Sequence, residues 1–220
     1  MSYPIDVLPH VFLVRHGEVE GNGGARPTFA GWADKPLTPR GENQAAAVAH
    51  RLSRETVGVV QSSDLQRARI TAEKIAAPHG LAVAQNRLWR EINYGAWEGL
   101  GEAEILRDWA KEWHRRVADP ETFGPPEGES YSALWARMQP VWNTLLETIE
   151  STTEKSGVLV AHNGPIRILL CHVLGVPFSH YRRIDASNCG LSRIEWKLKN
   201  HERHFVVRCL NETAHLHDVS

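Results

Sequence analysis

The sequence predicts an α/β protein, a three-layer sandwich in which helices cover both faces of a mainly parallel central sheet. Short apolar runs rich in β-branched residues alternate along the chain with longer segments whose apolar residues recur at helical spacing. This alternation is typical of parallel strands joined by crossover helices. Because 220 residues is the length of one domain, we expect a single domain over 1–220, with a helical, substrate-covering excursion at about 100–130.

The predicted strands are short apolar runs, four of which are followed directly by polar residues. The clearest is 158–161, and the last two runs close the chain. In chain order the strands are expected at 11–14, 57–61, 81–84, 158–161, 191–196 and 205–210.

Helices are predicted between these strands from caps and from the spacing of apolar residues. Thr38 is the expected N-cap of a helix that has Pro39 at its first position and ends near Leu52. Ser63 or Asp64 is expected to cap the next helix. A further apolar helix follows the strand at 158–161 and runs to about 174.

The segment 100–155 differs from the rest because it contains no predicted strand. Two helices are expected at 101–117 and 131–150, separated by a stretch rich in Pro and Gly. Each helix carries two tryptophans at helical spacing, so each pair falls on one face. These tryptophans fit either a core stripe or an aromatic cap over a pocket; they are Trp109, Trp113, Trp135 and Trp142.

Composition excludes several classes of function. A formal net charge of -1 argues against a broad basic surface for nucleic acid. No apolar stretch approaches the ~20 residues that span a bilayer, and the N-terminus lacks the pattern of a signal peptide. The cysteines are odd in number and widely spaced, which fits neither a disulfide framework nor a zinc site. We therefore expect a soluble, cytoplasmic protein without membrane or nucleic-acid partners.

Polar side chains suited to binding phosphate follow the predicted strands. Ligands of α/β sheets bind beyond the carboxyl ends of the strands, so these side chains are expected to converge on one edge. In chain order they are Arg15, His16, Asp64, Arg67, Arg90, Glu91, His162 and Asn163.

This set of side chains predicts phosphoryl transfer. Arginines pair bidentately with phosphate oxygens, and the helix N-termini after Ser63 and His162 are expected to offer amides to an anion. A neutral imidazole can attack phosphorus and form a phosphohistidine. Glu91 is the candidate general acid, since its pKa would rise beside a phosphate dianion. A second histidine can donate hydrogen bonds to the equatorial oxygens. Three nearby carboxylates compete with Glu91 for the acid role, namely Glu98, Glu102 and Glu104.

Four segments resemble, in order, the motifs of the histidine phosphatase superfamily, also called phosphoglycerate mutase-like. They are 13–18 (Leu-Val-Arg-His-Gly-Glu), 63–72, 88–99 and 160–167. The resemblance implies that family's fold and a reaction without metal or cofactor. It also implies that His16 is phosphorylated, that Arg15, Arg67 and His162 clamp the phosphoryl group, and that Glu91 serves as acid and then as base. Asn22 and Asn163 are implied as further phosphate contacts.

Two residues depart from the family pattern, and two segments are similar to those of its phosphatase members. Asn163 replaces the first glycine of the usual His-Gly-Gly, although asparagine tolerates a left-handed backbone. Ala30 stands where phosphoglycerate mutases usually carry a hydroxyl residue, and the third motif is compact as in phosphatases. The end of the chain, 210–216, resembles a tail seen in phosphatase members, or is simply a tolerated C-terminus.

Three functions are weighed on these residues. The leading hypothesis is hydrolysis of a small phosphorylated metabolite through a phosphohistidine on His16, with broad specificity or with alpha-ribazole phosphate as substrate. A cofactor-dependent phosphoglycerate mutase is the alternative, and a non-catalytic phosphate-binding module is the alternative of another class. A mutase needs a second anion site, for which the candidates are Arg90, Arg107, Lys111, Arg115 and Arg116. The sequence leaves the substrate and a homodimeric state open.

Overall fold

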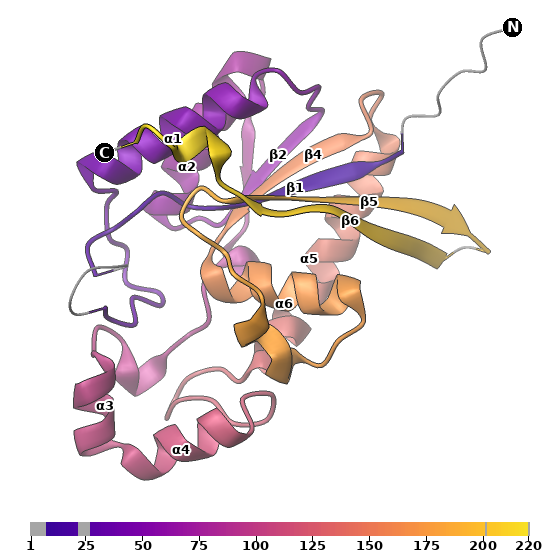
Figure 1. Cartoon of the computed structure of the whole chain (residues 1–220). Helices are drawn as coiled ribbons and strands as arrows, with labels where there is room; N and C mark the ends of the chain where they lie inside the picture. The colour runs from indigo at the N-terminus through magenta and orange to yellow at the C-terminus, as the bar shows by residue number, and fades with distance from the viewer. Residues whose placement is uncertain (1–7, 22–26, 201, 220) are drawn as a thin grey trace, which may run out of the picture.

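The computed structural model describes residues 8–21, 27–200 and 202–219, and these residues form the expected α/β sandwich (Figure 1). Its strands are β1 (His10–Arg15), β2 (Val59–Ser62), β3 (Val83–Gln85), β4 (Ser156–Ala161), β5 (Leu191–Lys199) and β6 (Glu202–Glu212). In the described chain they form one six-stranded sheet in the order β3-β2-β4-β1-β5-β6. The first four strands are parallel, and β5 and β6 are antiparallel, which confirms a mainly parallel sheet.

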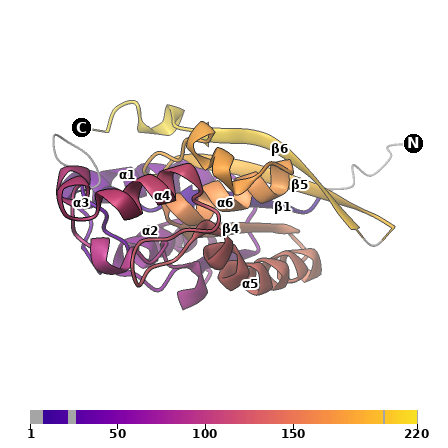
Figure 2. The same cartoon turned by 90° about the horizontal axis from the view of Figure 1, so that it is seen from below.

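Helices cover both faces of the sheet because side chains alternate along each strand. Phe12 and Val14 of β1 pack with α1 (Pro39–Leu52) and α2 (Gln66–Ala76). Val11 and Leu13 pack on the opposite face with α5 (Tyr131–Ser151) and α6 (Asn163–Leu174). Seen from below, β6 and the C-terminal segment lie along one side of the molecule, opposite α5 (Figure 2). The two apolar clusters are the two cores of a three-layer sandwich.

Helix starts agree with the sequence in α1 and differ in α2. Thr38 Oγ1 accepts a hydrogen bond from Gly41 N at 3.0 Å, which confirms the predicted cap. The predicted cap of α2 is wrong, because the helix begins at Gln66 and Leu65 stands at its N-cap position. The side chain of Asp64 forms an ion pair with Arg90 at 2.6 Å instead.

The helix expected at 101–117 is two helices, α3 (Glu102–Asp108) and α4 (Ala110–Ala118), which meet at Trp109. Neither Gly nor Pro marks the break, so the helical pattern of the sequence continues across it. Figure 1 shows the two helices packed together, apart from the layers that cover the sheet. Trp142 of α5 is buried in the core, as a core stripe requires, whereas Trp113 lies against Phe29 and Trp97.

The sheet register brings the ends of β1 and β4 side by side. Arg15 pairs with Ala161, and His16 N donates a hydrogen bond to Ala161 O at 3.0 Å. His16 and His162 therefore follow neighbouring strand ends, although 146 positions separate them in the sequence. In the described part of the chain, no helix is long and apolar enough to cross a membrane.

Candidate active site

His16 lies directly after β1, and its ring is 3% exposed. Nδ1 lies 2.6 Å from Gly17 O, to which it can only donate, and Nε2 accepts a hydrogen bond from Arg67 Nε at 3.2 Å. These contacts indicate that the proton is on Nδ1 and the lone pair on Nε2. Burial, Arg67 and Arg15 hold the pKa of His16 well below its ordinary value, so the ring is neutral and nucleophilic at pH 7.

His162 lies beside His16 and is fully buried. The two ring centroids are 5.0 Å apart at an interplanar angle of 61°. Burial first, then the positive charge of Arg67, holds the pKa of His162 well below its ordinary value. Neither ring nitrogen has a hydrogen-bond partner among the described residues. Such an orphaned buried donor is costly in a protein, which is why it points to a ligand.

Two arginines place positive charge next to His16. Arg15 Nη1 donates to Ala186 O at 2.7 Å, and its buried Nε has no partner in the described chain. Arg67 is buried, and its Nη1 and Nη2 donate to Ala33 O and Gly31 O, each at 2.7 Å. Neutral carbonyls fix both guanidinium groups without cancelling their charge, which leaves that charge for an anion.

Glu91 supplies a carboxyl group that is 8% exposed. Its Oε1 accepts hydrogen bonds from Ile92 N at 2.9 Å and Gly164 N at 3.0 Å. Burial raises the pKa of Glu91 above its ordinary value, and this effect outweighs the two N–H groups and the charges of Arg67 and Arg15. A larger share of the group is therefore protonated near neutral pH, as a general acid requires.

The expectation that two helix N-termini offer free amides to an anion is wrong for two of these amides, Gly164 N and Gln66 N, because each is hydrogen-bonded to a side chain of the protein. Gly164 N, in the first turn of α6, binds the Glu91 carboxyl group. Gln66 N, at the start of α2, donates to Asp34 Oδ1 at 2.7 Å. A helix N-terminus attracts an acidic group, and at these two helices that group is a side chain of the protein and not a bound ligand.

The other candidate carboxylates have different roles. Glu98 accepts hydrogen bonds from the backbone N of Trp32 at 2.9 Å and of Tyr94 at 3.1 Å, and so joins two loops. Glu104 accepts from Gly101 N at 2.8 Å at the start of α3. Glu102 is exposed at the rim of a second cavity. Of the four carboxylates, Glu91 alone lines the cavity that contains His16.

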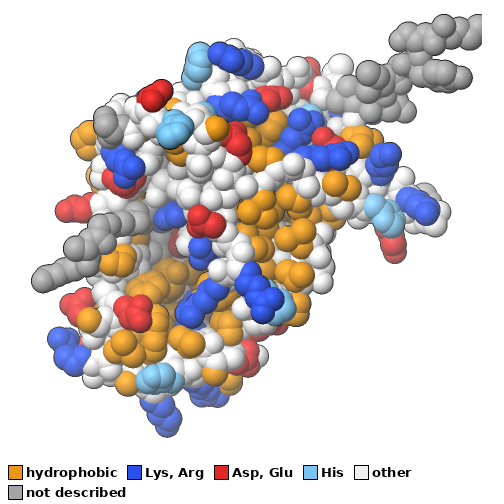
Figure 3. All heavy atoms as spheres, viewed as in Figure 1, with side chains coloured by type: hydrophobic (Ala, Val, Ile, Leu, Met, Phe, Trp, Pro, Cys, Tyr) orange, Lys and Arg blue, Asp and Glu red, His pale blue; other side chains and the backbone are white. Residues whose placement is uncertain are grey.

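Most of the site residues line a cavity of about 190 Å³, whereas His162 lies beside His16 without lining it. Asn163 also lines this cavity, and its buried Oδ1 has no partner among the described residues. Asn22, expected to touch phosphate, lies outside the residues that the structure describes. Figure 3 shows Lys and Arg side chains together with hydrophobic ones around a hollow on this face of the molecule. The sequence-predicted residues that line the cavity are Arg15, His16, Arg67, Glu91 and Asn163.

A second cavity of about 220 Å³ adjoins the first, and the two share Phe29, Tyr94 and Asn163 in their walls. Arg116 of α4 lines it and is 3% exposed. Its Nε and Nη2 have no hydrogen-bond partner in the described chain, and its guanidinium lies 5.2 Å from the ring centre of Tyr131. An aromatic wall with one buried cation suits an anionic group on an organic molecule.

Arg116 is the one member of the expected set of cations that lines this second cavity. Arg90 is paired with Asp64, and Arg107 with Asp108, each at 2.6 Å. Arg115 lies over the ring of Phe123, 3.6 Å from its centre. Arg167 and Arg182 also line the second cavity, although the sequence did not single them out for an anion site.

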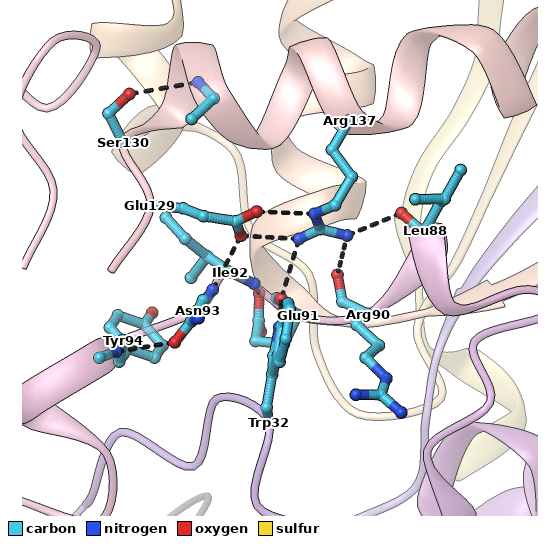
Figure 4. Close-up of polar contacts among 12 residues, drawn as sticks. Trp32, Leu88, Arg90, Glu91, Ile92, Asn93, Tyr94, Glu129, Ser130 and Arg137 are labelled. Atoms are coloured by element: carbon cyan, nitrogen blue, oxygen red, sulfur yellow. Dashed lines mark hydrogen bonds and ion pairs between the residues drawn. The ribbon is translucent and has the colours of Figure 1, made fainter. Parts of the chain in front are cut away.

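Arg137 of α5 points toward the segment 88–91 and forms hydrogen bonds with it (Figure 4). The sequence did not indicate this role. It donates to Leu88 O at 2.7 Å and to Glu91 O at 3.1 Å, while its Nε pairs with Glu129 at 2.7 Å. Trp32 Nε1 also donates to Glu91 O, at 2.7 Å. The backbone of Glu91 is therefore held by two side-chain donors, Arg137 and Trp32. An arginine in the middle of a helix gives no sequence signal of such contacts.

Replacing Arg137 with Met is expected to destabilise the protein by about 1–3 kcal/mol, because carbonyl groups around Glu91 lose their donor. The loss also frees the backbone of the acid, so kcat is expected to fall. Thermal unfolding and steady-state hydrolysis measure the two effects. Arg69→Met, which breaks an exposed helix pair with Glu73, is the control and is expected to cost at most about 0.5 kcal/mol. Equal unfolding temperatures for both variants would contradict the prediction.

The arrangement of a neutral histidine, two uncancelled arginines and a raised-pKa carboxyl group defines a phosphoryl-transfer enzyme. Residues 11–213 match the family model of the histidine phosphatase superfamily (branch 1), and the chain belongs to this family. Its members act through a phosphohistidine without a metal ion. Among the described residues, no group of three or more His, Cys, Asp and Glu side chains is arranged to hold a metal.

Relatives within the family include phosphatases and mutases. The chain is 32% identical over 206 residues to phosphoserine phosphatase 1 of Hydrogenobacter thermophilus, covering 94% of this chain and 93% of the relative. It is 36% identical over 186 residues to a probable phosphoglycerate mutase GpmB of Serratia proteamaculans, covering 84% of each. The structure of a mycobacterial glucosyl-3-phosphoglycerate phosphatase superposes with a TM-score of 0.80 at 27% identity, covering 94% of this chain and all of that one.

Proposed function

We propose that the protein hydrolyses phosphomonoesters and that His16 is the residue phosphorylated on the way. The observation that carries the proposal is the state of the His16 ring, which is neutral, has its lone pair on Nε2 and is held between Arg15 and Arg67. A nucleophile needs that lone pair, and a phosphoryl group needs the two charges.

In the first step, His16 Nε2 attacks phosphorus and the bond to the ester oxygen breaks. Glu91 gives its proton to the leaving oxygen, which departs as an alcohol. The Nε–H of Arg67 that faces Nε2 in the described geometry becomes a donor to the phosphoryl oxygens once the N–P bond has formed. Arg15 Nε and an N–H group of His162 are further donors for the equatorial oxygens, where charge develops.

In the second step, the ionised Glu91 takes a proton from water, and the water oxygen attacks phosphorus. The N–P bond breaks, the electron pair returns to His16 Nε2, and inorganic phosphate leaves. Acid and base are thus one carboxyl group used in opposite directions. Asn163 is proposed as a polar contact where the phosphate cavity meets the second cavity.

The leaving group is proposed to occupy the second cavity and to carry a carboxylate or a similar anion. Support comes from buried Arg116, which the described chain leaves without an acidic partner, and from Arg167 and Arg182 in the same wall. The names of the relatives agree with this class, since phosphoserine and phosphoglycerates carry a carboxylate near the phosphate. The same cations are the feature that favours the alternative of a phosphoglycerate mutase.

The segment with α3 and α4 is proposed to cover the substrate as part of one domain over 1–220. Trp113 and Arg116 of α4 and Glu102 of α3 supply its contribution to the wall of the second cavity. The three cysteines are free thiols in the described structure, which supports a reducing compartment such as the cytoplasm as the site of action.

One experiment distinguishes a phosphatase from a mutase. Purified protein is incubated with 3-phosphoglycerate in the presence and absence of 2,3-bisphosphoglycerate, and both inorganic phosphate and the 2-isomer are measured. We expect phosphate to be released without prior accumulation of the 2-isomer. Isomerisation much faster than phosphate release would establish the mutase instead. Phosphate binding with neither reaction, on this or any other monoester, would indicate a non-catalytic module.

Arg116→Met tests the proposed substrate class. For phosphoserine or 3-phosphoglycerate, kcat/KM is expected to fall about 10- to 100-fold, because a charge-assisted hydrogen bond is lost. For p-nitrophenyl phosphate, which lacks the carboxylate, the change is expected to stay within about 2-fold. Because a buried arginine without an acidic partner is costly, the unfolding temperature is expected to be unchanged or higher.

Arg115→Met at the neighbouring exposed position is the matched control. An equal loss of activity on both kinds of substrate in Arg116→Met would show that Arg116 supports the fold of the site and not the leaving group.

A further inference from the structure

The loop between η4 (Phe178–Arg183) and β5 contacts the Arg15–His16 pair in three places. Ala186 O accepts the hydrogen bond from Arg15 Nη1 at 2.7 Å. Cys189 N donates to Arg15 O at 2.9 Å, and Asn188 Nδ2 donates to His16 O at 2.9 Å. One loop therefore fixes the Arg15 side chain together with the backbone of both residues.

The C-terminal segment holds this loop through the side chain of Asn211. Asn211 Oδ1 accepts from Ser187 N at 2.8 Å, and its Nδ2 donates to Asp185 Oδ2 at 3.0 Å and to Ser187 Oγ at 3.1 Å. The amide side chain thereby closes the turn that presents Ala186 O to Arg15. Asn211 has a φ of 50°, a left-handed conformation that asparagine tolerates better than most residues.

His215 makes a second connection from the same segment. It lies in η5 (Ala214–Leu216), and its Nε2 is 3.0 Å from Cys189 O, while Nδ1 is 3.3 Å from Glu212 Oε1. Cys189 has a φ of 54°, which costs about 1–2 kcal/mol for such a residue and persists only where neighbours enforce it. In Figure 1 the segment after β6 runs toward α1, with which η5 is in contact.

We infer that Asn211 and His215, which we call the C-terminal clasp, are positioning residues that hold Arg15 and His16 in their reactive geometry through the loop 185–190. The inference rests on the proposed phosphatase function. It assigns a role to the tail at 210–216, which the sequence left between a family feature and a tolerated C-terminus. Among the described residues, Ala186 O is the one hydrogen-bond partner of the Arg15 side chain, so a shift of Ala186 is expected to move the guanidinium.

The test compares Asn211→Gly with Asn200→Gly. Glycine accepts the positive φ at both positions, so the first substitution removes the amide contacts without straining the backbone. Asn200 has a φ of 52°, is exposed and lies at the β5–β6 turn, which makes it a matched control. His215→Ala, with exposed His217→Ala as its control, tests the second arm of the clasp and covers the case that Asn211→Gly fails to fold.

In single-turnover experiments well below the unfolding temperature, Asn211→Gly is expected to slow phosphorylation of His16 by about 10- to 100-fold, as a misplaced catalytic group does. The affinity for vanadate, which mimics the trigonal-bipyramidal phosphorus, is expected to fall by a similar factor. Orthophosphate, which resembles the ground state, is expected to lose less affinity. Asn200→Gly and His217→Ala are expected to stay within about 2-fold of wild type in every measurement.

A purely structural role predicts a different result. The unfolding temperature of Asn211→Gly would fall, while the phosphorylation rate and the vanadate affinity of the folded protein stayed at wild-type values; that outcome overturns the clasp. If the proposed function is wrong, the result is different, because the wild-type protein would then form no phosphohistidine with any monoester. Vanadate affinity, measured by calorimetry, would still report whether the clasp positions Arg15.

Discussion

Replacement of His16 by Ala is expected to lower kcat for phosphomonoester hydrolysis by about 10⁴-fold or more, a loss typical of an enzyme without its nucleophile. The alternative nucleophile in the described site is His162, whose ring lies beside that of His16. His162 follows β4, and no hydrogen bond among the described residues fixes the lone pair of its ring as Arg67 fixes that of His16. We therefore expect that His162 does not replace His16 as the nucleophile. KM is expected to change less than kcat, because both arginines remain to bind phosphate.

The decisive measurement is the covalent intermediate. Wild-type protein quenched during turnover is expected to carry a phosphoryl group that is labile in acid and stable in base, and peptide mapping is expected to place it on His16. The assay is run in EDTA, so that measurable metal dependence would contradict the proposed mechanism. His204→Ala, an exposed position on β6, serves as control and is expected to retain full activity. Residual turnover of His16→Ala near the wild-type rate would exclude His16 as nucleophile.

The sequence predicted which of these side chains lie close together, because strand ends determine where residues meet. His16 and His162 each follow a buried apolar strand, and parallel pairing of β1 with β4 brings such positions together without any further information. Arg67 follows from the same rule applied to β2, since it is the second residue of the helix α2 that comes after this strand. The proposed general acid is harder to predict, since four glutamates compete within fourteen positions, and Glu91 differs from the others in being buried and in lining the cavity that contains His16.

What the sequence missed depends on contacts between distant segments. Arg137 reaches the backbone of residues 88–91 from the middle of α5, and Asn211 reaches residues 185–187 from the end of β6. Neither side chain belongs to a local pattern, because many of its partners lie far away in the sequence and several of them are backbone groups that any residue would present. The same limit applies to Gly164 N, whose partner Glu91 lies 73 positions away and makes this amide unavailable to phosphate.

Glu91→Gln is expected to lower the rate of phosphorylation by about 10²–10⁴-fold for alkyl phosphates, whose leaving oxygen needs a proton. For p-nitrophenyl phosphate the leaving group is stable as an anion, so this step is expected to change far less. Hydrolysis of the phosphohistidine needs the base, and the variant is therefore expected to accumulate phosphoenzyme on the activated substrate. Rapid-quench measurements on both substrates check this; equal losses in the first step would contradict the acid role.

The pH dependence follows from the raised pKa of Glu91. Phosphorylation by wild type needs the protonated carboxyl group, so its rate is expected to fall as the pH rises through the raised pKa. Because the folded-state pKa lies above that of the unfolded chain, the stability associated with the protonated carboxyl is complete below the unfolded value. It is lost as the pH rises through the folded value.

Glutamine keeps an oxygen for Ile92 N and Gly164 N but cannot ionise, so it escapes this loss. The unfolding temperature of Glu91→Gln is therefore expected to exceed that of wild type by a margin that grows with pH, while activity falls. Glu73→Gln, at an exposed position of α2, is the control and is expected to show no such growing margin. A margin that shrinks with increasing pH would mean that the ionised carboxylate stabilises the fold, and Glu91 would then be a partner of the arginines instead of the acid.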